Sequence, residues 1–434
     1  MKSLLSLKTE FQKALRVGWF LAFRQIRRSG RGTTALIIFI MVLTFLNLVV
    51  VSGLLVGLMS GAFKQFQESY SGEVIVTTAT GHNYIENSSN LINFLRAHPE
   101  VKSFSTRHTI GATVLGTLTD LPQKNQRANQ MSTQLVGIDP VAEQPVTGFS
   151  RFVSSGAPLG PNDWGKILIG RNLIKKYSSF ADANIPGLDF LEKVDIGSRV
   201  RVSFSTTDGN LVAKEFIIQG IVKSKVDQIS ARVFILDKEL EQMLPVNKEQ
   251  YQEIAIRTNP NYAPTLVKEI KNFLGTGYEA RAQTASEAIP SFLRDVETTM
   301  GVLGNALSSI ALVVAAITIF IVIFINAVTK RKFIGIMKGI GISPLSIKLS
   351  YVIQALFYGV VGSAVGLLLT FGLLQPYFNA YPIDFPFSDG ILVATASGAS
   401  IRVAILLVVT LLAGYIPAML IVRKNTLDSI LGRN

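Results

Sequence analysis

Long stretches without a charged residue alternate with charged segments along this chain. Four uncharged runs of 32, 32, 35 and 20 residues lie between Arg31 and Lys64, Glu297 and Lys330, Lys348 and Asp384, and Arg402 and Arg423. A transmembrane helix needs about 20 predominantly apolar residues. The pattern therefore predicts four membrane-spanning helices, in residues 33–62, 298–329, 349–375 and 401–422.

The first two runs are longer than a bilayer requires. A helix of their 32 residues extends about 48 Å, whereas the hydrocarbon core is about 30 Å thick. We expect the surplus of 33–62 and of 298–329 to form a stalk. Ser286–Thr299, with Pro290 near its start, is predicted to continue the second helix backwards and to couple the preceding segment rigidly to the stalk.

Residues 63–297, between the first two runs, have a different pattern. Short apolar strands alternate there with helical patches, which is typical of an α+β domain. The predicted strands are 73–78, 110–118, 134–138, 199–204, 216–222, 233–236, 253–256 and 278–282, and the predicted helices are 90–97, 171–177 and 263–273. Residues 177–195 are interpreted as a surface insertion.

The net charge of +13 is concentrated in the short segments that flank the membrane runs. The large middle segment is neutral, since residues 61–300 contain 25 basic and 25 acidic residues. The excess lies in residues 1–32, 330–348 and 423–434, whereas the connection 376–400 has no basic residue. The positive-inside rule therefore predicts that both termini and the 330–348 segment are cytoplasmic, with 376–400 an outer loop. The expected fold is a membrane protein with four transmembrane α-helices and a large α+β extracytoplasmic domain, residues 63–297, between helices 1 and 2.

The N-terminal segment 1–32 shows helical periodicity of its own. Apolar residues recur at helical spacing at Phe11, Leu15, Trp19, Ala22, Phe23 and Ile26, and Lys13, Arg16, Arg24 and Arg27 take another face. This predicts a basic amphipathic helix lying on the cytoplasmic leaflet. A basic flank without defined structure is the alternative.

Recognisable catalytic chemistry is absent from the sequence. The chain has no cysteine, which excludes disulfides, Cys-zinc sites and thiol nucleophiles. It has no Gly-x4-Gly-Lys-Ser/Thr phosphate loop, so no ATP-hydrolysing module of its own is recognised. For His82, His98 and His108 we expect surface or loop roles without catalysis or metal binding. The interiors of the membrane runs lack ionisable residues, which disfavours proton-driven transport.

Small residues recur every four positions in two of the runs. They are Gly53, Gly57 and Gly61 in the first run, and Gly362 and Gly366 in the third. Such spacing lets helix backbones approach closely. The spacing is consistent both with helix packing within one chain and with an interface between two chains.

The cytoplasmic link 330–348 is the most specific feature of the sequence. Phe333, Ile336, Met337 and Ile340 would form one apolar face of a short helix that ends at Gly339 and Gly341. Ser343 followed by Pro344 provides an N-cap and a first-turn proline for the next helix. The link is therefore predicted to be a rigid elbow that exposes a basic and apolar helix.

This link resembles that of the MacB/LolC/LolE/FtsX group of ABC transporter permeases. The similarity lies in Ile334-Gly-Ile-Met-Lys338 and in Ile340-Gly341 with Ser343, and Phe333 stands where the group usually has an acidic residue. The tail agrees with the group's closing pattern through Tyr415-Ile-Pro-Ala418, Arg423 and Asp428, with Thr426 in place of a proline.

The resemblance implies a function without a catalytic site or cofactor in this chain. In the group, a separate or fused ATPase dimer, which binds ATP and Mg²⁺, lies under two identical or homologous permease chains, and hydrolysis is relayed through the stalk. The ATPase-docking residues would be Lys332, Phe333, Ile336, Met337, Lys338, Gly339, Ile340, Gly341 and Ser343. The expected cargo is amphiphilic, such as a lipoprotein, lipid, peptide or hydrophobic drug, exported or extracted from the bacterial inner membrane or periplasm.

Two alternatives remain beside the transporter. One is an FtsX-like regulatory subunit that controls an outer partner such as a cell-wall hydrolase. The other is a membrane receptor or scaffold that works without ATP. Membrane lipid, and a periplasmic adaptor or chaperone, are further expected partners, and nucleic acid is not.

Overall fold

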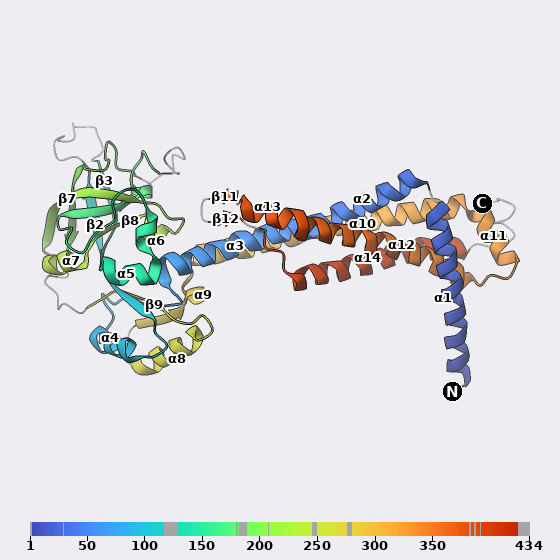
Figure 1. Cartoon of the computed structure of the whole chain (residues 1–434), viewed down its shortest axis with the longest axis horizontal. Helices are drawn as coiled ribbons and strands as arrows, with labels where there is room; N and C mark the ends of the chain where they lie inside the picture. The colour runs from blue at the N-terminus through green and yellow to red at the C-terminus, as the bar shows by residue number, and fades with distance from the viewer. Residues whose placement is uncertain are drawn as a thin grey trace. The chain divides into compact units, whose positions relative to one another are not determined.

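The computed structural model comprises two units (Figure 1). The helical unit is Met1–Met59, Asp295–Ile383 and Gly390–Asn434, and the sheet unit is Ser60–Arg294 with Asp384–Asp389. The structure describes residues 2–28, 30–116, 129–178, 181, 189–206, 208–244, 250–275, 280–381, 383–385, 388–390 and 392–423. The predicted insertion around 185–188 and the closing residues 424–434 lie outside these ranges.

Four helical stretches in the described residues are long and apolar enough to cross a membrane. They are Arg31–Ser71, Ser291–Thr329, Pro344–Ala380 and Ala396–Leu420. The first comprises α2 (Arg31–Leu46), η1 (Asn47–Val51), α3 (Ser52–Phe66) and η2 (Gln67–Ser71); the others are α10 (Ser291–Thr329), α12 (Pro344–Leu369) with η5 (Thr370–Leu374) and α13 (Gln375–Ala380), and α14 (Ala396–Val422). The shorter elements of this region are α1 (Lys2–Arg28), α11 (Arg331–Gly339), β11 (Ile383–Phe385) and β12 (Ser388–Gly390).

The core of the helical unit lies between α2, α10, α12 and α14. Met41, Phe45, Ile319, Tyr351 and Leu406 are fully buried in one apolar cluster. These four helices pack side by side because each presents an apolar face to the others.

Two boundaries differ from those predicted. The helix expected to begin near Ser286 begins at Ser291, because Ile289, which precedes Pro290, takes an extended conformation. The preceding residues form a separate short helix, α9 (Ala285–Ala288). The last membrane helix begins at Ala396, so that Arg402 lies within it and donates a hydrogen bond of 2.6 Å to Ser52 Oγ.

The sheet unit is built on a ten-stranded sheet. Its strands are β1 (Val74–Thr78), β2 (Ser103–Leu115), β3 (Gln130–Ile138), β4 (Val153–Gly156), β5 (Lys166–Gly170), β6 (Arg199–Ser205), β7 (Leu211–Val222), β8 (Arg232–Leu236), β9 (Glu253–Arg257) and β10 (Ala280–Thr284). Its other elements are α4 (Ser88–Ala97), α5 (Pro140–Thr147), η3 (Phe149–Phe152), η4 (Arg171–Leu173), α6 (Asp227–Ser230), α7 (Asp237–Met243) and α8 (Ala263–Leu274).

Two sub-structures share the long strand β2. The strand order β10-β1-β9-β2, with α4 and α8 packed on one face, is the split βαβ arrangement of ferredoxin-like folds (Figure 1). The pairings of β2, β3, β8, β5, β7 and β6 close into a ring around a second apolar core. The large segment between β2 and β9 is thus an insertion into the first sub-structure.

Most predicted elements of the sheet unit are confirmed, and one is wrong. The helix predicted at 171–177 is only the single turn η4, because Ile174 takes an extended conformation and forms a bridge to Leu191. Strand β5 was not predicted. Its residues Ile167–Ile169 are buried on both faces and therefore lack the alternation that marks a half-exposed strand.

Candidate functional site

The predicted docking helix is present as α11, and it packs on the helical unit by one face. Ile334 and Gly335 are buried, and Ile334 belongs to the apolar core of the unit. Phe333, Ile336 and Ile340 are 67%, 50% and 73% exposed. The structure therefore brings three of the four predicted apolar residues together on an exposed surface, which we call the α11 surface (Phe333, Ile336, Ile340).

The fourth apolar residue, Met337, is placed differently. Its side chain is half-buried and packs against the apolar core of the helical unit. Lys332 is exposed and Lys338 is half-buried. Burial lowers the pKa of Lys338, and the charge of Lys348 adds to this effect.

The helix α11 ends as predicted, through the backbone conformation of Gly341. Gly341 has a φ of +89°, and its N–H donates to the Lys338 carbonyl at 3.1 Å. This left-handed residue ends the helix as in glycine C-caps. The predicted N-cap of α12 is confirmed, since Ser343 Oγ accepts from the Leu345 N–H at 3.3 Å. Gly339 has open space around it and is not required by close packing.

Three of the five predicted packing glycines, Gly53, Gly362 and Gly366, lie at close contacts within this one chain. A Cβ on Gly362 would lie 2.4 Å from Met41 Cβ, and one on Gly366 would lie 2.3 Å from Phe45 Cδ1. A Cβ on Gly53 would lie 2.8 Å from Leu392 Cδ1. Gly57 is buried and Gly61 is half-buried.

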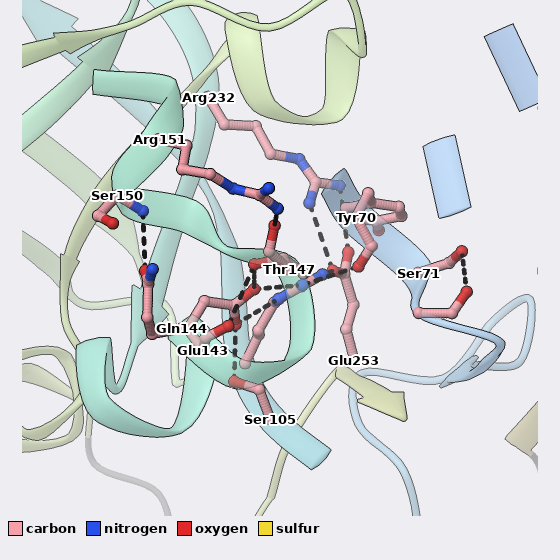
Figure 2. Close-up of polar contacts among 12 residues, drawn as sticks. Tyr70, Ser71, Ser105, Glu143, Gln144, Thr147, Ser150, Arg151, Arg232 and Glu253 are labelled. Carbon is pink, nitrogen blue, oxygen red and sulfur yellow. Dashed lines mark hydrogen bonds and ion pairs between the residues drawn. The ribbon is translucent and has the colours of Figure 1, made fainter. Parts of the chain in front are cut away.

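A buried charged network holds the end of the first long helix in the sheet unit (Figure 2). We call its members, Tyr70, Arg107, Glu143, Arg232 and Glu253, the Tyr70 network; all are under 10% exposed except Arg232, whose side chain is 11% exposed. They come from five elements: η2, β2, α5, β8 and β9. Its two guanidinium groups balance its two carboxylates.

Arg107 is the centre of the Tyr70 network. Its Nη2 donates to Glu143 Oε1 at 2.6 Å and to the Tyr70 carbonyl at 2.8 Å, and its Nε donates to Glu143 Oε2 at 3.1 Å. Arg232 pairs with Glu253 at 3.1 Å. The guanidinium carbons of Arg107 and Arg232 lie 4.9 and 5.4 Å from the centre of the Tyr70 ring, which suits cation–π attraction.

Glu143 is charged in spite of its burial. Burial opposes ionisation, but the Arg107 charge and hydrogen bonds from Arg107, Ser105 and Thr147 outweigh it and lower the pKa of Glu143 below its ordinary value. Ser105 Oγ and Thr147 Oγ1 donate to the carboxylate at 2.6 and 2.8 Å. The same balance, with Arg232 as the main partner, lowers the pKa of Glu253.

A second contact fixes the chain just beyond the Tyr70 network. Gly72 has a φ of +64°, and a Cβ there would lie 2.4 Å from the Ile256 carbonyl oxygen. Next to it, Glu73 pairs with Arg257 at 2.9 Å and accepts from the Thr258 N–H at 3.0 Å. The chain therefore leaves the helix through a tight turn pressed against β9.

Both long helices contribute apolar side chains to the core of the sheet unit. Phe66 and Tyr70, from the end of the first, are buried in one cluster with Phe234. Leu293, at the start of α10, packs against the same cluster. The ends of both long helices are therefore part of the apolar core of the sheet unit.

Sequence reasoning did not find the Tyr70 network. Its charged residues are spread along the chain; Arg107 and Glu253, for instance, are 146 positions apart. The signal in the sequence was Glu253 at the start of the predicted strand 253–256, which in isolation does not identify its partners.

The histidines are placed in three different ways, and the prediction for His108 is wrong. His82 is exposed in a turn, and His98, at the end of α4, pairs with Glu269 at 3.0 Å. His108 is buried on β2, its ring tilted by 39° against that of Tyr251, with its Nδ1 2.5 Å from Asp237 Oδ1.

His108, Asp237 and Glu241 place possible metal-ligand atoms within 4.8 Å of one another. Two ligands of a tetrahedral zinc, each about 2.0–2.1 Å from the metal, lie about 3.3 Å apart. The 2.5 Å between His108 Nδ1 and Asp237 Oδ1 is shorter than that separation, and the two groups are hydrogen-bonded to each other. The histidine therefore serves as a buried hydrogen-bonded group that joins β2 to α7.

Comparison with known proteins gives a family match in the helical unit. Residues 305–426 match the family model described as FtsX-like permease C-terminal. The macrolide export ATP-binding/permease protein MacB of Pasteurella multocida is 23% identical over 178 residues, which are 40% of this chain and 26% of that protein. MacB of Neisseria gonorrhoeae is 27% identical over 148 residues, 33% of this chain and 22% of that protein. The ABC transporter permease YtrF of Bacillus subtilis is 30% identical over 89 residues, 20% of this chain and 19% of that protein.

Solved structures were matched as well. The extracellular domain of the noncanonic ABC-type transporter YknZ from Gram-positive bacteria has a TM-score of 0.30 at 12% identity, covering 48% of this chain and 98% of that one. The periplasmic region of MacB from Actinobacillus actinomycetemcomitans has a TM-score of 0.31 at 12% identity, covering 50% and 91%.

The family match confirms the resemblance found in the sequence. Residues 305–426, which include most of α10 and all of α11, α12 and α14, match the FtsX-like permease model. Part of the chain is thus similar to FtsX-like permeases, and the curated relatives with matching segments include ATP-binding/permease proteins. The matches span 26% or less of the length of these curated relatives.

Proposed function

We propose that the chain is the membrane subunit of an ATP-driven ABC transporter that exports or extracts an amphiphilic cargo by mechanical transmission. ATP is hydrolysed by a separate ATPase dimer, and a second permease chain, identical or homologous, completes the complex. The FtsX-like permease region and relatives named as ATP-binding/permease proteins support this proposal. In it, both termini and α11 lie on the cytoplasmic side of a bacterial inner membrane, and the sheet unit lies outside.

The α11 surface is the main support for the proposed contact with the ATPase. Phe333, Ile336 and Ile340 are exposed on a helix whose opposite face is buried by Ile334. Exposed apolar side chains grouped in this way mark interaction sites. Lys332 lies beside them and Gly341 fixes the end of the helix, so the surface is rigid and basic at its edge.

The Tyr70 network supports the mechanical part of the proposal. The first long helix begins at Arg31 and ends at Ser71, among side chains of four other elements of the sheet unit. A helix end held by buried ion pairs and a buried ring moves the sheet with it. Cargo between the helices is amphiphilic in this proposal because the spans expose mainly apolar side chains.

The test is recovery of the ATPase with a tagged chain purified from its native membrane in mild detergent. Phe333→Asp is expected to reduce the ATPase recovered by about tenfold or more, since burying such a side chain is worth about 1.5–3 kcal/mol. Leu211→Asp, at a residue 74% exposed on β7, is the matched control and should have no effect. Equal ATPase recovery with both variants would overturn the docking assignment.

A further inference from the structure

The N-terminal helix α1 has three distinct faces. At about 100° per residue, Ala14, Gly18 and Ala22 form a face of small residues, and Leu15, Trp19 and Phe23 form the apolar face beside it. The third face is basic and includes Lys13, Arg16, Arg24, Arg27 and Arg28. Each face has a different environment in the structure.

The small face packs on α12. Ala14 and Ala22 are buried, and a Cβ on Gly18 would lie 3.0 Å from Leu349 Cβ and 3.1 Å from the Ser346 carbonyl oxygen. Small residues spaced four positions apart permit this close approach of the two helices. Because Ser346 belongs to the first turn of α12, α1 is fixed to the helix that directly follows α11 and its glycine turn.

The other two faces of α1 are uncovered. Trp19 and Phe23 are 64% and 61% exposed, and Phe11 and Leu15 are about half exposed. Gln12, Lys13, Leu15, Arg16 and Trp19 line an open hollow of 650 Å³. Figure 1 shows α1 running crosswise to the long helices of its own unit.

We propose that the uncovered faces of α1 form a binding site for anionic phospholipid, with Lys13 and Arg16 on the headgroup phosphate and Trp19 at the acyl boundary. Tryptophan is enriched at membrane interfaces, and basic side chains are attracted by anionic headgroups. The side-by-side basic and aromatic faces favour a lipid surface over a protein occupant. The site rests on the proposed membrane placement of the chain and not on its ATPase partner.

The site has a consequence for α11. Lipid bound to α1 anchors the start of α12 through the Ala14, Gly18 and Ala22 contact. The elbow between α11 and α12 is then held at the membrane surface from two directions, by the core around Ile334 and by α1.

Trp19 makes the proposal measurable, because Trp164 is the only other tryptophan in the chain. The full chain carrying Trp164→Phe is reconstituted in phosphatidylcholine vesicles that contain equal mole fractions of brominated phosphatidylglycerol or brominated phosphatidylcholine. Trp19 fluorescence should be quenched by both lipids, and at least twofold more strongly by the anionic one. Lys13→Gln with Arg16→Gln should abolish the difference and leave the quenching by phosphatidylcholine. Arg96→Gln with Lys102→Gln, at exposed residues of the sheet unit, is the matched control and should keep it.

Three outcomes would overturn the proposal. Equal quenching by the two lipids in the parent chain would remove the headgroup preference. No quenching by either lipid would place Trp19 outside the interface. Protection of Trp19 from both lipids when the chain is purified with its protein partners would assign the surface to a protein. None of these results depends on ATP hydrolysis, so the proposed transporter function is tested separately.

Discussion

Removal of the Glu143 charge is expected to destabilise the sheet unit strongly. Glu143 accepts two hydrogen bonds from Arg107, one from Ser105 and one from Thr147, at 2.6–3.1 Å. In Glu143→Gln the buried Arg107 guanidinium loses its main counter-charge and keeps one neutral amide oxygen in its place, together with the Tyr70 carbonyl and Glu253, the latter at 3.4 Å. Breaking a buried ion pair by removing one partner costs about 3–5 kcal/mol.

The cost can be measured by urea unfolding of the reconstituted chain, followed by Trp164 fluorescence in a Trp19→Phe background. With an m value of about 3 kcal/mol/M, the urea midpoint should fall by about 1–1.7 M. Arg107→Met should have a cost of similar size, because it leaves the Glu143 carboxylate without a counter-charge.

The double variant decides between ion pairing and simple packing. Arg107→Met with Glu143→Gln should be less destabilised than the sum of the two single variants, since neither charge is then left unpaired. A loss below about 1 kcal/mol for Glu143→Gln, or strict additivity in the double variant, would refute the reasoning.

Three further predictions concern pH and close packing. Because the pKa of Glu143 is lowered in the folded state, its charge stabilises the fold above the ordinary pKa of 4.5, and this stabilisation is lost as the pH falls through the lowered folded pKa. Glu143→Gln should therefore reduce the loss of stability at acid pH, measured by the same urea unfolding assay. Gly366→Leu should lower the thermal aggregation temperature of the detergent-solubilised chain by several degrees, whereas Gly372→Leu, where a Cβ meets open space, should not; equal shifts would contradict the packing. Gly72→Ala should lower the free energy of unfolding in urea more than Gly81→Ala does, because both glycines have positive φ but only Gly72 lies against a carbonyl oxygen. Equal losses would show that backbone strain alone accounts for the effect and that the contact with the carbonyl does not contribute.

Much of the fold could be predicted because its signals are local. A predominantly apolar run of about 20 residues or more is typical of a membrane-spanning helix, wherever it lies in the chain. The Ser343-Pro344 N-cap depends on two neighbouring residues and was confirmed. Alternating strands such as β6 and β7 were recognised because one face of each is exposed.

The sequence alone thus determined the membrane runs, the α+β character of the large segment and the family resemblance of the link after Lys330. The tertiary structure decided what surrounds each side chain. It buried His108, it turned Met337 of the predicted docking face towards the core, and it placed Ala14, Gly18 and Ala22 of α1 against α12. The Tyr70 network shows the physical reason. Its charges are stable only when strands far apart in the chain bring two arginines and two glutamates together in a dry interior, and no local pattern specifies which strands will be neighbours.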